Sequence, residues 1–173
     1  MANSKRQDFF PNYMSWRVTE SGADTFTTDK IFTPIPRSQV LIGNKATVME
    51  LLWWEVSVPN IQLDAAGEFI ICNISTGGVP TDVLGINEGN TVTYKYVELA
   101  LLTSGAALIE QPFRYDMQSK DGYGMLLATD AFHSSVTSTN TGIALIFDFR
   151  LYYRFVQIPV TEYIGIVQSQ QTS

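Results

Sequence analysis

Side chains that could catalyse a reaction or hold a metal are few and scattered in this sequence. His133 is the only histidine and Cys72 the only cysteine. A lone histidine cannot build a zinc site, and Cys72 lies in an apolar run that predicts an inert, packed thiol. No catalytic-triad, zinc-protease, dinucleotide-binding or phosphate-loop motif occurs. We therefore predict a protein that is not an enzyme and that binds no metal and no cofactor.

Acidic residues offer two alternatives, neither of which is favoured. Asp116, Asp121 and Asp130 flank one expected turn and could ligate calcium, which prefers several oxygen ligands. Solvated turn residues are the favoured interpretation. Glu110 and Asp116 could be the carboxylate pair of a glycosidase, but nothing in their spacing supports this. The prediction of a non-enzymatic protein stands.

The composition favours a subunit of an assembly. Charged residues make up 16% of the 173 residues, whereas roughly 25% is usual for soluble domains. Contacts between subunits would cover the uncharged surface that such a chain must expose. The net charge is −6, and the only basic pair near a terminus is Lys5-Arg6. This is not the charge distribution of a nucleic-acid-binding arm.

The elements that carry these residues are expected to be strands. From Ile143 to Phe155 every odd position is apolar, and the even positions include Asp148, Arg150 and Arg154. This period of two predicts a strand with one buried face, roughly 40 Å long at about 3.3 Å per residue. Further strands are expected at residues 13–20, 25–32, 46–58, 68–74, 112–118 and 124–136, with 158–168 as a short edge segment.

The rest of the chain fits an all-β domain. Residues 94–102 fit a strand or a short helix, residues 75–93 and 134–142 are expected to be loops, and no amphipathic helix of convincing length is found. These strands predict a two-sheet antiparallel sandwich, for which jelly-roll and Greek-key topologies both fit.

The segment 46–58 is apolar on both faces, so both faces are expected to be covered. The opposing sheet would cover one face, and a loop, a neighbouring strand or a second subunit the other. Trp53 and Trp54 are adjacent and must point to opposite faces. One is expected in the core, and the other is a candidate interface anchor because tryptophan is enriched at interface centres. A sugar-stacking role is the alternative.

Arg150, Tyr152 and Arg154 share the even face of the last strand. A basic and aromatic strand face could contact nucleic acid through phosphate pairing and base stacking. The favoured interpretation is a solvated face, or ion pairs between subunits that involve Asp148.

Several segments, taken in their order along residues 31–170, carry a resemblance to a known group. They are Phe32–Arg37, Lys45–Leu52, Asp121–Asp130, Asn140–Gly142, Leu151–Phe155 and Thr161–Gln170. Each alone is low in specificity, but their order resembles capsid proteins of small circular Rep-encoding single-stranded DNA viruses from environmental samples. The resemblance implies a single jelly roll that self-assembles in the host cell into an icosahedral shell, the virion, around a circular single-stranded DNA genome.

Such capsid proteins commonly begin with a long basic arm, and this sequence departs from that pattern. The resemblance therefore supports shell formation more than genome binding. The alternative function is a non-enzymatic β-sandwich module that binds a carbohydrate or a receptor.

The expected layout is a short N-terminal arm over residues 1–12, a jelly-roll domain over 13–168 and a polar tail over 169–173. No apolar stretch approaches the ~20 residues of a membrane span. Candidates for subunit contacts are Trp53, Trp54, Val79, Pro80 and Asn87. Candidates for a DNA-facing surface are Arg37, Lys45, Arg150 and Arg154.

Overall fold

The computed structural model describes residues 11–35, 41–61, 67–83, 85, 88, 90–99 and 112–171. In chain order its elements are β1 (Asn12–Thr19), β2 (Thr27–Phe32), β3 (Leu41–Ile42), β4 (Lys45–Ser57), β5 (Glu68–Ser75), β6 (Thr91–Leu99), β7 (Phe113–Asp116), β8 (Met125–Leu127), β9 (Ala131–Thr139), β10 (Ile146–Pro159) and α1 (Val160–Gln171).

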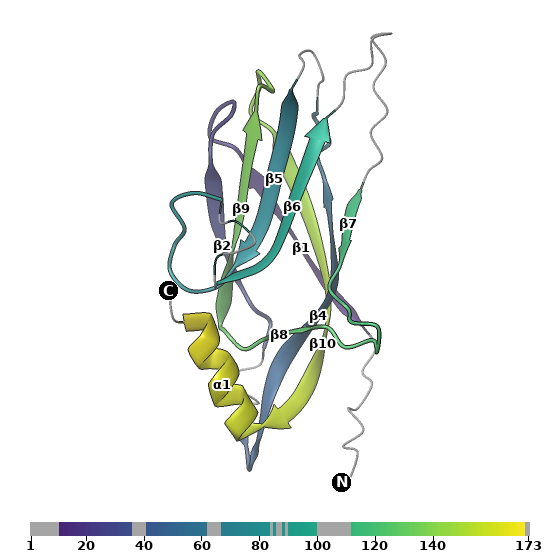
Figure 1. Ribbon diagram of the computed structural model, residues 1–173, viewed down its shortest axis with the longest axis vertical. Helices are drawn as coiled ribbons and strands as arrows, with labels where there is room; N and C mark the ends of the chain where they lie inside the picture. The colour runs from purple at the N-terminus through teal and green to yellow at the C-terminus, as the bar shows by residue number, and fades with distance from the viewer. Residues whose placement is uncertain are drawn as a thin grey trace.

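The strands form two antiparallel sheets that pack as a sandwich, with α1 at one end (Figure 1). The first sheet has the order β1-β10-β4, and β3, β7 and β8 also pair with β4. The second sheet has the order β2-β9-β5-β6. The chain crosses repeatedly between the sheets, so strands that pair are often distant in sequence. This is the strand order of a jelly roll, and it confirms the predicted fold class.

The core between the sheets is built on the alternation of the last strand. Leu145, Phe147, Phe149 and Leu151 are each at most 2% exposed, as the period of two predicted. Burying a side chain of this kind contributes about 1.5–3 kcal/mol. Trp54 is fully buried beside them, and its indole Nε1 donates a hydrogen bond to Thr93 Oγ1 at 2.9 Å. That bond satisfies the polar atom that the ring carries into the core.

A β-bulge in β4 decides which of its residues face the core. Tyr152 of β10 pairs with Trp53 and Tyr153 pairs with Leu51, so Leu52 is the extra residue. Leu51 and Trp54 therefore both point into the core, although strict alternation would separate them. On the outward face, Glu50 comes before the bulge and Trp53 after it. Strict alternation therefore does not hold across Leu52.

The segment 158–168, expected as an edge strand, is instead the end of β10 as far as Pro159 and then the helix α1. Its apolar residues Val160, Tyr163, Ile164 and Val167 have helical spacing. Tyr163 and Val167 pack onto the outward face of the first sheet. The β-branched residues suggested a strand, and docking against the sheet overrides that propensity. Among the described residues, no helix is long and apolar enough to cross a membrane.

Two further expectations near β9 were wrong. The predicted strand 124–136 is interrupted at residues 128–130, where Thr33 bonds to the turn through its backbone N–H and its hydroxyl. The predicted loop 134–142 is instead strand as far as Thr139. This Ser/Thr-rich segment pairs with β2 on one side and β5 on the other, so the ladder satisfies its backbone despite the loop-like composition. The ambiguous segment 94–102 falls largely in β6.

Candidate functional site

Three aromatic rings form a row across the outward face of the first sheet. Tyr13 pairs with Tyr152, and Tyr152 pairs with Trp53, so the three side chains share one face of β1, β10 and β4. The rings of Tyr152 and Trp53 are stacked, with centroids 4.4 Å apart and an interplanar angle of 20°. The centroids of Tyr13 and Tyr152 are 6.1 Å apart.

Guanidinium groups cover both ends of this row. Arg114 of β7 lies 4.8 Å from the Trp53 ring centroid, and Arg150 lies 5.4 Å from that of Tyr13. We call Tyr13, Trp53, Tyr152, Arg114 and Arg150 the ring row. Because β7 and β10 flank β4 on opposite sides, Arg114 and Tyr152 cover opposite faces of the indole. Trp53 therefore presents an edge, which does not support sugar stacking or base stacking on this residue.

A groove of about 560 Å³ runs beside the ring row over β1, β10 and β4. Its charged walls are paired: Arg17 bonds to both carboxylate oxygens of Asp148, at 2.6 and 2.9 Å. Exposed pairs of this kind contribute at most about 1 kcal/mol each. The groove is lined by Ser15, Arg17, Glu55, Ser57, Asp148 and Arg150.

The local charge of this region is balanced. Arg114 bonds to Asp116 at 2.8 Å, and Arg150 sits opposite Glu55 in the β10–β4 ladder. Together with the Arg17–Asp148 pair, cations and carboxylates match one to one. A phosphate backbone needs unopposed cations, so this face suits a protein surface better than a nucleic acid. The groove and the ring row together are called the open half of the outward face.

The other half of the same face is covered by the protein itself. Ala46 and Val48 of β4 and Val156 and Ile158 of β10 pack under α1 and are at most 3% exposed. We call these four residues, with the helix on top of them, the covered half. A cover over the second face of β4 was expected, but over this half it is the helix α1 and none of the three covers named from the sequence.

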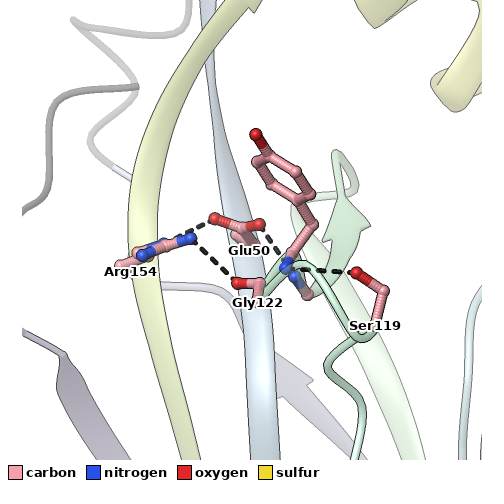
Figure 2. Close-up of polar contacts among 6 residues, drawn as sticks. Glu50, Ser119, Gly122 and Arg154 are labelled. Carbon is pink, nitrogen blue, oxygen red and sulfur yellow. Dashed lines mark hydrogen bonds and ion pairs between the residues drawn. The ribbon is translucent and has the colours of Figure 1, made fainter. Parts of the chain in front are cut away.

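A buried ion pair separates the two halves (Figure 2). Glu50 is fully buried, and its Oε2 accepts a hydrogen bond from Arg154 Nε at 2.6 Å. Its Oε1 accepts the backbone N–H of Gly124 at 2.8 Å. Arg154 also donates to the carbonyl of Gly122 at 3.4 Å. The pair thereby ties the turn that precedes β8 to both central strands.

The turn can lie this close only because residue 124 is glycine. A Cβ at Gly124 would lie 2.0 Å from the backbone oxygen of Leu51, so a larger residue would push the turn away. Ser119 holds the other side of the turn through its Oγ, which accepts the backbone N–H of Tyr123 at 3.3 Å. The ring of Tyr123 is half exposed.

The structure separates the residues predicted for subunit contacts. Trp54 lies in the core, whereas Trp53 lies in the ring row, so the opposite orientation of the pair is confirmed. Val79 is 70% exposed and Pro80 is buried in the segment after β5. Asn87 lies outside the described residues. A role of these residues in subunit contacts stays a prediction.

The residues predicted to face DNA do not form one patch. Arg150 belongs to the ring row, and Arg154 is engaged by Glu50. Lys45 lies at the far end of β4, ten residues from Glu55, which pairs with Arg150. Along the strand, Lys45 is therefore about 33 Å from Arg150. Arg37 lies outside the described residues. A DNA-facing role for these residues stays a prediction.

Among the described residues, the histidine, the cysteine and the acidic side chains do not gather at one site, and Glu110 lies outside the described residues. Cys72 is 1% exposed, and burial raises the pKa of its thiol. Within the described parts of the chain, no three His, Cys, Asp or Glu side chains lie close enough together to hold a metal ion.

Sequence reasoning missed Tyr13, Arg17 and Arg114 as members of the open half. Tyr13, Ser15 and Arg17 occupy alternate positions of β1, and this spacing indicates that they share one face of the strand. What the sequence could not supply was the register that places β1 and β7 beside β10 and β4.

Comparison with known proteins gives a likeness of fold. No protein-family model matches the chain. No curated protein matches it either. Among solved structures, VP1 of Trichodysplasia spinulosa-associated polyomavirus, in complex with GM1 oligosaccharide, is similar with a TM-score of 0.52 and 10% identity, over 92% of this chain and 97% of that chain.

Two other polyomavirus structures agree. VP1 of New Jersey polyomavirus is similar with a TM-score of 0.53 and 8% identity, over 87% of this chain and 100% of that chain. VP1 of Merkel cell polyomavirus, in complex with disialyllactose, gives 0.52 and 8%, over 92% and 98%. At such identities the likeness establishes that this chain has the jelly-roll sandwich fold of these VP1 proteins.

Proposed function

We propose that this protein is a structural subunit of a viral capsid and has no enzymatic activity. The observation that carries the proposal is the jelly-roll fold shared with VP1 capsid proteins over nearly the whole of both chains. The low content of charged residues and the sequence resemblance to capsid proteins of small single-stranded DNA viruses support the same function. The assembled form would be an icosahedral shell built in the host cell and released as a virion.

Self-association would use the open half of the outward face. Tyr, Trp and Arg are the residue types enriched at the centres of protein interfaces, and the ring row consists of them. The matched charges of the groove let one copy present both signs to another. A surface of this composition gains from contact with a neutral, similarly patterned partner, and a second copy of the chain is such a partner.

Enclosure of a circular single-stranded DNA genome is the finer part of the proposal. Its support is the sequence resemblance, together with Lys45, an exposed cation that is remote from the paired charges of the groove. Genome contact through Lys45 would weaken as salt concentration rises.

Carbohydrate binding is the second candidate function. It is favoured by two of the similar structures, which are complexes with GM1 oligosaccharide and with disialyllactose. A stacking platform at Trp53 is not the means, because its ring faces are covered. Binding to a glycan array by a protein that stays monomeric would favour this module over the capsid subunit.

The test of the proposal is electron microscopy in negative stain on a size-exclusion peak of the purified protein, with absorbance read at 260 and 280 nm. Uniform closed particles are expected, and an absorbance ratio typical of nucleic acid would support genome enclosure. A monomeric peak that persists across salt and pH would overturn the capsid proposal.

A further inference from the structure

The only histidine of the chain lies where three elements meet. His133 is 5% exposed on the outward side of β9, between Lys30 of β2 and Ser75 of β5 in the ladders of the second sheet. It lines a cavity of about 300 Å³ that reaches the helix α1 through Tyr163 and Gln171. The imidazole therefore forms part of the wall between the second sheet and α1.

The surroundings of the ring suit a neutral imidazole and not a charged one. Among the described residues, His133 Nδ1 has no hydrogen-bond partner and is inaccessible to solvent. A neutral ring can leave one nitrogen as a bare acceptor, whereas an imidazolium must carry an N–H on both nitrogens. A buried N–H with no acceptor is costly, and a buried charge without a counter-ion is costlier still.

Burial and the charge of Lys30 oppose protonation of the ring. Lys30 pairs with His133 in the β2–β9 ladder, and burial together with Lys30 lowers the pKa of His133. The other titratable groups lining the cavity are Asp130, which is exposed in the turn before β9, and Tyr163 of α1. Ser75, across the ladder from His133, brings no charge, and its Oγ is itself buried without a partner in the described structure.

The helix on the other side of the cavity is lightly held. No residue of α1 is buried. The side-chain amide of Gln170 ties the helix to the segment before β9: it accepts from Ala128 N at 3.0 Å and donates to the Leu126 carbonyl at 2.7 Å. Only four residues separate Ala128 from His133. A displacement of the start of β9 would therefore act directly on the segment that holds α1.

We propose that protonation of His133 at acidic pH releases the helix α1 from the first sheet. When His133 gains a proton, the imidazolium leaves its niche for water, the turn at 128–130 shifts, and the Gln170 attachment opens. The helix then loosens from the first sheet and uncovers the apolar residues Ala46, Val48, Val156 and Ile158. Acid thus exposes a surface that is closed at neutral pH.

Because His133 is the only histidine, its titration gives a single imidazole signal in nuclear magnetic resonance. The signal should titrate below the ordinary value of about 6.5. Hydrogen exchange of α1, followed by mass spectrometry and corrected for the intrinsic pH dependence, should lose about tenfold protection between about pH 7.5 and 5. Peptides from β4 and β10 in the core should keep theirs.

Two variants make the test decisive. His133→Gln removes the proton site and should reduce the acid-dependent loss of protection in α1 to less than about twofold. Lys30→Met changes an exposed side chain and should move both the His133 titration and the α1 opening to higher pH by the same amount. If α1 opens equally in wild type and His133→Gln, or if Lys30→Met shifts the titration but not the opening, the proposal is wrong.

Discussion

The outward face of the first sheet has two halves, one packed under α1 and one open at a groove. The covered half and the open half are built on the same two central strands, β4 and β10, and are adjacent in the ladder. The covered half is apolar and closed by α1. The open half carries the ring row and matched ion pairs around a groove.

The difference shows how a jelly roll divides its outward surface. An apolar sheet face must be covered, and the chain covers part of it with the twelve-residue helix α1. The part without such a cover has side chains that satisfy one another in the monomer and can still pack against a partner. The Glu50–Arg154 pair marks the boundary because it is buried by the turn at 119–124.

The largest effect should come from breaking that boundary. Arg154→Met leaves the fully buried Glu50 carboxylate without its cation, which typically destabilises a protein by about 3–5 kcal/mol. Urea denaturation should show a correspondingly lower midpoint. The double variant Glu50→Gln/Arg154→Met should recover much of the loss, since no buried charge is left unpaired. Equal stability of Arg154→Met and wild type would show that the Glu50–Arg154 pair does not stabilise the boundary between the halves.

A large effect confined to assembly is expected in the open half. Trp53→Ala removes the centre of the ring row and should weaken self-association by about 2 kcal/mol or more, roughly 30-fold. Sedimentation at several concentrations measures this. Tyr96→Ala is the matched control, because Tyr96 is a 47% exposed ring on the outward side of the second sheet. Equal losses in both variants would contradict a specific role for the open half.

A moderate effect is expected in the covered half. Gln170→Ala removes both bonds between α1 and the 126–128 segment and should cost about 1–2 kcal/mol. Hydrogen exchange in α1 should rise while exchange in the core strands stays the same. Ser169→Ala on the same helix is the control for a change in helix propensity, because the Ser169 hydroxyl donates to the Ile166 carbonyl within the helix itself. If both variants behave alike, the helix is not held by Gln170.

The smallest effect should come from Glu20, which lies in neither half. Glu20 is 3% exposed, and its carboxylate accepts bonds from Leu145 N and Ser138 Oγ. Burial raises its pKa, so its contribution to stability is fully present below the unfolded value near 4.5 and is lost as pH rises through the folded value. Thermal melting of Glu20→Gln should therefore fall less with rising pH above about 4.5 than wild type does. A parallel decline would exclude Glu20 as the source.

Glu20→Gln is also a useful background in which to measure the effect of His133 on stability. The two groups oppose each other on acidification, because a lowered histidine pKa makes stability fall as pH falls. Measuring the His133 effect in a Glu20→Gln background removes the opposing slope.

The sandwich could be predicted from the sequence because the alternation of apolar and charged residues along its longest strand identifies the buried face. Phe147, Phe149 and Leu151 alternate with charged residues, and all three are buried. The helix α1 could not be predicted as well, since Val160, Ile164 and Val167 have strand propensity and helical spacing at once. The apolar sheet face beneath Tyr163, Ile166 and Val167 selects the helix.

Only some residues of the open half could be predicted from the sequence. Trp53 and Arg150 could be named because each stands on a recognisable strand face. Their partners Tyr13 and Arg114 lie on β1 and β7, which are distant from them in the sequence. Which of those strands lie side by side depends on the topology of the jelly roll. The bulge at Leu52 adds a one-residue shift that no periodicity reveals.

The most direct test of the account is sedimentation velocity of the wild type and of Trp53→Ala/Arg114→Glu over a wide concentration range. Both changes lie in the open half, and neither side chain is in the core. The account predicts large closed assemblies for the wild type and a folded, stable monomer for the variant. A wild type that stays monomeric, or a variant that assembles as well as the wild type, would contradict it.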